Sequence, residues 1–293
     1  MHWQRRLKSR IKIREPLKKH TTLRIGGPAD LFIRPRDSAD LKVLLPALKR
    51  DKIPLLVMGA GSNLLAADKG LKAAILKLDS SFFKEISCRD TCLELGSAVM
   101  LGEAVREAAR RGLGGIEFLA GIPGTVGGAL AMNAGAWGRN IGELIEKARV
   151  MDYKGNISWL KKERIKFGYR KSSLAKYIIL GARLKLARKN KEVTREEIKK
   201  YLSLRRKTQG VCLPNAGCIF KNPPEESAGR LIDLCGLKGK RIGGACVSRR
   251  HANFILNCGR AKAADVLKLM HLIKRRVKAK FNIDLQPEIK VWQ

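Results

Sequence analysis

The segment of residues 121–135, GIPGTVGGALAMNAG, restricts the fold of this chain more than any other. Five of its fifteen residues are glycine and none is charged, although the chain carries 61 lysine and arginine residues. Glycine at this density lets a backbone approach a ligand closely and turn its N–H groups toward it, and Pro123 stiffens the turn. Two interpretations are open from the segment alone. It forms a wall of a cofactor site with phosphate near the loop, or it forms a buried glycine-rich turn or a tight helix–helix contact.

Length and composition predict a globular protein of two or three domains. The chain has 293 residues, of which 45% are hydrophobic, enough for more than one core. No run of about 18 apolar residues is present, so we expect no membrane span. The basic N-terminal segment lacks the apolar core of a secretory signal, so we expect a cytoplasmic protein.

The net charge of +35 has three possible explanations: nucleic-acid binding, anionic small-molecule substrates, or a basic bias of the whole proteome. The basic residues are spread along the chain, and aromatic residues make up only 5%, too few for obvious base-stacking platforms. The pattern therefore favours anionic small-molecule ligands together with a general bias. A basic nucleic-acid-binding protein stays as the rival from another class.

Seven cysteines and four histidines predict neither disulfides nor a metal site. The number of cysteines is odd, no CxxC pair occurs, and the histidines are scattered. Without a secretion signal, reduced thiols are expected. Most of these cysteines are interpreted as small core residues.

Hydrophobic spacing predicts alternating helices and strands. Ser38 is a candidate N-cap for the first helix, and composition places a weak boundary near residue 206. The expected strands cover residues 21–33 with a turn at 26–28, and then 54–58, 72–78, 92–95 and 178–186, with a hairpin over 146–160. The expected helices cover residues 38–50, 101–111, 193–206, 227–235 and 263–281.

The loop GAGSN at residues 59–63 follows a predicted strand, which is also the place of the dinucleotide-binding fingerprint. Leu64 stands where that fingerprint requires glycine, and no helix pattern follows. The loop can still form an anion-binding nest of backbone N–H groups with the Ser62 and Asn63 side chains. A phosphate loop at 236–241 is excluded, because its spacing is wrong and Arg241 stands where Ser or Thr is required.

Eight motifs occur in the order found in one known family. They are TTLRIGGPADL, GAGSNLL, GIEFLAGIPGTVGGALAMNAGA, GYRKSS, PNAGCIFKNP, SAGRLIDLCGLKG, HANFILN and LQPEI. Each is weakly specific alone, but eight in order are highly specific. From about Thr21 to Val291 the sequence resembles the UDP-N-acetylenolpyruvoylglucosamine reductase (MurB) family. The short spacing from GYRKSS to PNAGCIFKNP is similar to the type that lacks an extra substrate-covering loop.

The resemblance implies an α+β protein with the FAD-binding fold of the vanillyl-alcohol-oxidase (PCMH) type. Residues 1–78 and 79–206 would form two FAD-binding subdomains, and 207–293 a C-terminal substrate-binding domain. FAD would be bound non-covalently, because no histidine stands in the implied loops to tether it. The implied FAD-binding residues are Gly59, Ala60, Gly61, Ser62, Asn63, Leu64, Gly121, Ile122, Pro123, Gly124, Thr125, Gly127, Gly128, Asn133 and Ala136.

The resemblance also implies reduction of UDP-N-acetylglucosamine enolpyruvate to UDP-N-acetylmuramate, with a hydride from flavin N5 and NADPH as its source. Arg170 and Glu288 would stabilise the enolate. Cys218 stands where the family usually has the proton-donating serine, and a thiol is the stronger acid. Further substrate contacts are implied for Tyr169, Lys207, Lys221, Asn222 and Gln286.

Three further residues and the expected ligands complete the prediction. Lys290 stands where some relatives carry arginine, and His251 and Asn253 are interpreted as structural residues in a turn that enters a strand. The expected ligands are a UDP-sugar and NADPH, with no specific nucleic acid and no obligate protein partner. A flavin oxidoreductase of the same fold with another substrate is the nearer rival, and the C-terminal motifs argue against it.

Overall fold

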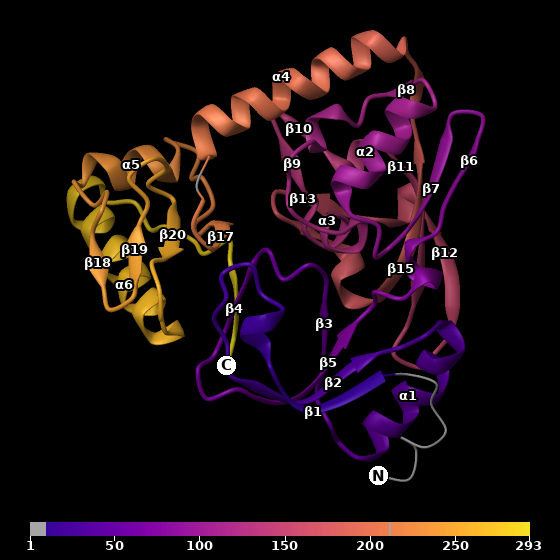
Figure 1. Cartoon of the computed structure of the whole chain (residues 1–293), viewed down its shortest axis with the longest axis horizontal. Coiled ribbons are helices and arrows are strands. Elements are labelled where there is room, and N and C mark those ends of the chain that lie inside the picture. The colour runs from indigo at the N-terminus through magenta and orange to yellow at the C-terminus, as the bar shows by residue number, and fades with distance from the viewer. Residues whose placement is uncertain (1–9, 211) are drawn as a thin grey trace. The chain divides into compact units, whose positions relative to one another are not determined.

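The computed structural model describes residues 10–210 and 212–293 and divides them into two compact units (Figure 1). The described residues of the first unit are 10–13, 31–59 and 73–204. The second unit consists of residues 14–30, 60–72 and 205–293. The chain therefore passes between the units several times. The predicted three-domain division, with boundaries after residues 78 and 206, stays a prediction.

A small sheet and one helix form the first part of the first unit. The sheet order is β1-β2-β5-β3, and β3 and β5 are parallel. Helix α1 (Ser38–Arg50) buries Leu41, Leu44 and Leu48 in the same apolar cluster as β2 and β5. The strands are β1 (Arg10–Pro16), β2 (Pro28–Arg34), β3 (Leu55–Met58) and β5 (Leu71–Lys77).

The strand predicted before the turn at residues 26–28 is wrong. The Thr21 hydroxyl donates to the Ile25 carbonyl (2.8 Å) and accepts from the Ile25 N–H (3.2 Å), which closes a tight turn. Arg24 adopts the left-handed region with φ of 56°. Leu23 and Ile25 are buried in the core of the second unit. Their burial accounts for the apolar spacing, which therefore does not indicate a strand here. The second predicted strand is confirmed as β2.

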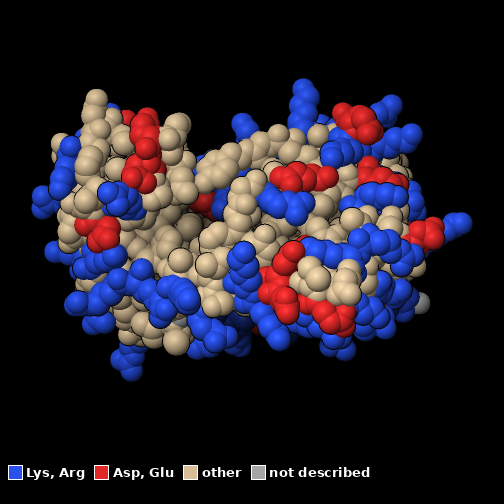
Figure 2. Space-filling model, turned by 90° about the horizontal axis from the view of Figure 1, so that it is seen from above, with Lys and Arg blue, Asp and Glu red and all other residues tan. Residues whose placement is uncertain are grey.

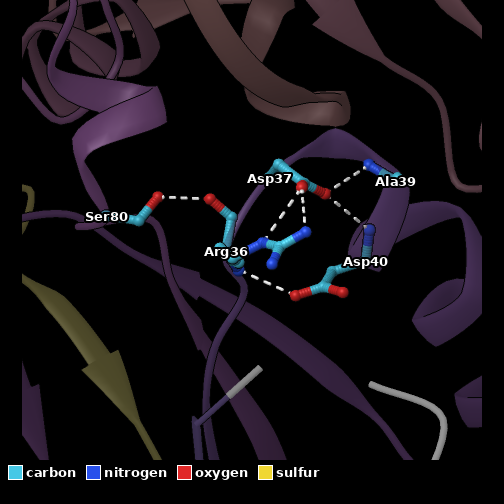
Figure 3. A network of polar contacts seen from close by, with 5 residues as sticks. All are labelled: Arg36, Asp37, Ala39, Asp40 and Ser80. Carbon is cyan, nitrogen blue, oxygen red and sulfur yellow. Dashed lines mark hydrogen bonds and ion pairs between the residues drawn. The ribbon is translucent and has the colours of Figure 1, made fainter. Parts of the chain in front are cut away.

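Asp37 caps helix α1, and the prediction of Ser38 as N-cap is wrong by one residue. One Asp37 carboxylate oxygen accepts from the N–H groups of Ala39 (2.8 Å) and Asp40 (3.0 Å), as Figure 3 shows. Arg36 donates to the other oxygen, and Ser80 donates to the Arg36 carbonyl (2.6 Å). Asp37 and Ser38 are adjacent residues of types that often cap helices, and the Asp37 carboxylate is the group that accepts from the free N–H groups.

A five-stranded antiparallel sheet forms the second part of the first unit, with the order β12-β11-β15-β7-β6. Apolar residues of one face pack with helices α2 (Leu101–Arg110) and α3 (Val126–Met132) in one cluster. The predicted hairpin is confirmed as β11 and β12. The strands are β6 (Ile86–Arg89), β7 (Cys92–Gly96), β11 (Ile145–Met151), β12 (Ile157–Lys161) and β15 (Ile178–Lys185).

Short two-residue strands and one long helix form further regular structure before the second unit's sheet. The two-residue strands are β8 (Leu113–Gly114), β9 (Gly135–Ala136), β10 (Arg139–Asn140), β13 (Phe167–Gly168), β14 (Lys171–Ser172) and β16 (Ala187–Arg188). Helix α4 (Lys191–Gln209) extends past both ends of the predicted helix, and Thr194 is its buried residue.

The second unit contains a four-stranded antiparallel sheet with the order β17-β20-β19-β18. Its strands are β17 (Asn215–Cys218), β18 (Arg241–Ile242), β19 (Ala245–Val247) and β20 (Phe254–Asn257). Helices α5 (Ala228–Leu234) and α6 (Ala263–Phe281) share its apolar core, and both were predicted. Strand β21 (Lys290–Trp292) pairs in parallel with β4 (Leu64–Ala66).

No helix within the described residues is both long and apolar enough to span a bilayer.

Candidate active site

The glycine-rich segment forms a turn followed by helix α3. Gly121 has φ of +74°, and the Thr125 hydroxyl caps α3 by accepting from the Gly128 N–H (3.3 Å). The N–H groups of Val126 and Gly127 donate to the carbonyls of Val99 and Ser97 (2.9 Å each). The segment therefore includes the close backbone packing that one of the two interpretations predicts.

The start of helix α3 makes two close contacts that require glycine. One contact is with the residue that follows β3, and the other is with Ser97 after β7. A Cβ atom at Gly59 would lie 2.9 Å from the Thr125 hydroxyl oxygen, and one at Gly127 would lie 3.0 Å from the Ser97 Cβ. Ser97 is buried, yet its hydroxyl has no hydrogen-bond partner within the described part of the chain. A buried donor beside a glycine-lined backbone is the environment that a polar cofactor would satisfy. The residues present therefore fit FAD.

Arg170 is connected to the same segment through its guanidinium group. Arg170 Nη1 donates to the Gly135 carbonyl (3.2 Å), and the guanidinium lies 5.4 Å from the centre of the Tyr169 ring. Asn133 holds the neighbouring hairpin, because its Nδ2 donates to the Gly168 carbonyl (3.2 Å) and its Oδ1 accepts from Gly142 N–H (3.1 Å). The first unit thus brings Arg170 to the end of the predicted FAD-binding segment.

The GAGSN loop continues from Gly59 into the second unit. Gly61 has φ of +69°, and a Cβ atom there would lie 2.1 Å from the His20 carbonyl oxygen. Thr22 donates its N–H to the Gly61 carbonyl (3.1 Å) and its hydroxyl to the Asn215 carbonyl (2.7 Å). Thr22 therefore links the loop to the first residue of β17, the strand that ends at Cys218.

Backbone hydrogen bonds hold Glu288 beside the residue that follows Cys218. Glu288 donates its N–H to the Ile219 carbonyl (2.8 Å), and Lys221 donates to the Gln286 carbonyl (2.9 Å). Asn63 Nδ2 donates to the Glu288 carbonyl (3.1 Å). The second unit thus brings together five of the predicted site residues, which are Asn63, Cys218, Lys221, Gln286 and Glu288.

Asn253 organises this part of the site, in agreement with its interpretation as a structural residue. Its Oδ1 accepts from the Phe220 N–H (2.9 Å) and its Nδ2 donates to the Phe220 carbonyl (2.8 Å), all of them buried. Burial also lowers the pKa of His251 in the same turn. The motif HANFILN contains Asn253, but the motif does not indicate that this residue holds Phe220, which follows β17.

Several predicted residues have other contacts. The Asn222 Oδ1 accepts from the Ala228 N–H at the start of α5 (3.1 Å). Lys207 is exposed on α4, and its carbonyl accepts from Arg250. Leu64 is buried in β4, which leaves only its backbone for a ligand. Within residues 10–210 and 212–293 no group of three or more His, Cys, Asp and Glu residues is placed to hold a metal ion.

Comparison with known proteins identifies two domain families. A FAD-binding domain model matches residues 29–161, and the C-terminal domain of UDP-N-acetylenolpyruvoylglucosamine reductase matches residues 208–292. The chain is 43% identical to the UDP-N-acetylenolpyruvoylglucosamine reductase of Pelobacter propionicus over 278 residues, 94% of each chain. It is 44% identical to that of Heliobacterium modesticaldum over 280 residues, which are 94% of this chain and 89% of the relative.

The structure also resembles the crystal structure of UDP-N-acetylenolpyruvylglucosamine reductase (MurB) from Thermus caldophilus. The TM-score is 0.84 at 38% identity, and the match covers 97% of this chain and 100% of the other. The fold and the glycine-lined loops define a flavoprotein oxidoreductase of the PCMH type. The chain belongs to the UDP-N-acetylenolpyruvoylglucosamine reductase family, the UDP-N-acetylmuramate dehydrogenases of peptidoglycan precursor synthesis. The predicted family and fold are confirmed.

Proposed function

We propose that this enzyme uses Cys218 in place of the usual serine to protonate the enolate formed from UDP-N-acetylglucosamine enolpyruvate. The observation that supports this is the Glu288 N–H bond to the Ile219 carbonyl (2.8 Å), because it holds the thiol-bearing strand beside the proposed acid. A thiol has a pKa of about 8.5, far below that of an alcohol. Cys218 is therefore a competent proton donor near neutral pH.

Arg170 and Glu288 take the electrostatic roles. The double bond of the substrate accepts a hydride at one carbon, and FAD supplies that hydride when it is bound and reduced. Negative charge then spreads over the second carbon and the substrate carboxylate. Arg170 as a cation and Glu288 as a neutral acid stabilise this charge, and the Cys218 Sγ–H gives its proton to the second carbon.

The proposed FAD contacts are the backbone of residues 59–64 and 121–128 with Asn133 and Ala136. This is supported by the close glycine packing and by the buried Ser97 hydroxyl. FAD is held without a covalent bond, because no histidine stands in these loops. Tyr169, Lys207, Lys221, Asn222 and Gln286 are the proposed substrate contacts.

NADPH is the proposed reductant, and the cytoplasm is the proposed location. The proposed subtype is the family type that lacks the extra substrate-covering loop. The spacing supports the subtype, because among the described residues β14–β16, one short 3-10 helix (Ser173–Lys176) and α4 separate Arg170 from β17. The reductant and the location are proposed from the family to which the chain belongs.

The test is anaerobic stopped-flow absorbance of the flavin bands in Cys218→Ala. We expect reduction by NADPH at nearly the normal rate, and reoxidation by the enolpyruvyl substrate slowed by roughly 10²-fold or more, because the proton donor is lost. Cys218→Ser should restore much of the second rate. The control is Cys212→Ala, at an exposed cysteine, with both rates unchanged. Equal loss of both half-reactions in Cys218→Ala would exclude the proposed role.

A further inference from the structure

Two cysteines of the second unit lie in contact on neighbouring strands. The Sγ atoms of Cys246 on β19 and Cys258, directly after β20, are 2.6 Å apart. This separation is roughly half an ångström longer than a disulfide bond of about 2.05 Å. Both side chains are partly exposed and both thiols are free.

The strand register explains why the two thiols meet. Cys246 lies opposite Leu256 on β20, and the Cys258 N–H donates to the Gly244 carbonyl (2.8 Å). The two cysteines are thus diagonal neighbours on one face of an antiparallel pair, the arrangement in which side chains two residues apart can touch. The contact is fixed by the sheet and needs no rearrangement of the backbone pairing.

The surroundings favour a stable pair of thiols over an isolated thiolate. Burial and the contact with Cys258 raise the pKa of Cys246 to about 11. Arg241 on β18 lies opposite Cys246 in the register and opposes this shift. Cys258 also donates to the Leu256 carbonyl (3.9 Å). Both sulfurs are therefore held in place while they are reduced.

We propose that Cys246 and Cys258 form a redox modification site that closes to an intramolecular disulfide by reaction with small-molecule disulfides. One of the two thiols first loses its proton to solvent, and the resulting thiolate attacks the small disulfide, forms a mixed disulfide and releases one thiol. The second thiolate then attacks the mixed disulfide, forms the S–S bond between the two cysteines and releases a second thiol. Two protein thiols are oxidised, one small disulfide is reduced to two thiols, and the proton of each protein thiol passes to a released thiol.

The other cysteines whose contacts are known have different partners. Cys92 donates to a Glu146 carboxylate oxygen (3.4 Å). Cys88 donates to the Asp90 carbonyl (3.7 Å). In the β6–β7 register, Cys92 lies opposite Arg89 and Cys88 lies opposite Leu93, so these two cysteines lie on opposite faces of their hairpin. They therefore provide a control pair that is near in sequence but cannot close.

The test is incubation of the full chain with oxidised glutathione, followed by intact mass, peptide mapping and thermal unfolding. We expect a mass loss of about 2 Da, a crosslinked peptide that joins Cys246 to Cys258, and a melting temperature raised by roughly 5–10 °C. The Cys88→Ser control should behave like the unchanged protein. Cys246→Ser and Cys258→Ser should each lose both the crosslink and the thermal shift and carry a glutathione adduct instead.

Two results would overturn the proposal. One is glutathione adducts on separate cysteines of the unchanged protein without the 246–258 crosslink. The other is a mass loss of about 2 Da that persists in both Cys246→Ser and Cys258→Ser, because other cysteines would then have formed the disulfide. Two independent serine variants are used so that a folding defect in one still leaves the pairing testable by the other.

Discussion

Gly61 is a residue whose conformation and surroundings both require glycine. Its φ is +69°, and a Cβ atom would lie 2.1 Å from the His20 carbonyl oxygen. An alanine would therefore either displace the His20 backbone or reshape the loop that bonds to Asn215 through Thr22. The position of this loop relative to β17 thus depends on the absence of one side chain.

We expect Gly61→Ala to lower the free energy of unfolding by roughly 3 kcal/mol, since left-handed strain and a steric overlap add. The matched control is Gly236→Ala. Gly236 also has a positive φ (+68°) in the same unit, but a Cβ there would meet nothing within 4 Å. The control should lose only about 1 kcal/mol. Urea unfolding of both variants measures the difference, and equal losses would show that the overlap with His20 is relieved without cost.

At the scale of elements, the cap of α1 is the clearest example of a carboxylate that stabilises a helix start. The half-buried Asp37 carboxylate accepts from two backbone N–H groups and from Arg36 (Figure 3). These contacts, first among them the Asp40 N–H, lower the pKa of Asp37 below its ordinary value of 3.8. A lowered folded-state pKa means that this stabilisation is present above about pH 4 and is lost as the pH falls through the folded-state value.

Asp37→Ala should therefore lower the free energy of unfolding by about 1 kcal/mol at pH 7. The difference from the unchanged protein should shrink below pH 4, because the protonated carboxyl group is a weaker cap. Asp37→Asn keeps an acceptor oxygen and should retain most of the stability at pH 7. Chemical unfolding from pH 7 down to pH 3 tests this. A difference that stays constant over the whole range would argue against the charged cap.

The sequence predicted regular elements well where burial alone decides them. Residues 263–281 were predicted as a helix and form α6 with the same bounds, because Val266, Met270, Ile273 and Val277 are buried at helical spacing. The strand expected at Thr21–Ile25 failed because hydrogen bonds of the Thr21 hydroxyl and a left-handed Arg24 determine that segment. Such local contacts leave no periodic signal.

The candidate site could be predicted only in part. Cys218 and Glu288 lie in segments far apart in the sequence, and the hydrophobic pattern of these segments does not predict that they lie close together in the fold. Their proximity comes from a backbone hydrogen bond between segments about seventy residues apart, and Asn253 holds one of these segments by its carboxamide. The residues were named through the family motifs, because strand pairing over such a separation is not encoded in local spacing.

At the scale of the whole molecule, the dominant physical property is a net charge of +35. Blue lysine and arginine side chains are scattered over the face seen in Figure 2, with several smaller red acidic clusters between them. Lysine and arginine are also spread along the whole sequence, so we treat the charge as a general field. Such a field raises the association rate of anionic ligands, and salt screens it.

We expect kcat/KM for the anionic UDP-sugar to fall several-fold as NaCl rises from about 10 mM to about 200 mM, because the Debye length shortens from roughly 30 Å to below 10 Å. The value of kcat should change little, since it does not depend on the rate of encounter. Steady-state kinetics at constant pH measures both. A kcat/KM that is independent of salt would mean that the positive charge does not assist substrate capture.

The second unit is assembled from three separate lengths of chain, and this affects how the protein can be made. Leu23, Ile25 and Leu65 belong to the same core as helix α6, and β4 pairs with β21. During synthesis on the ribosome, the early segments must wait until almost the last residues have emerged before this core can close. Their apolar side chains stay exposed for most of translation, so chaperone capture of the nascent chain is expected at residues 14–30 and 60–72.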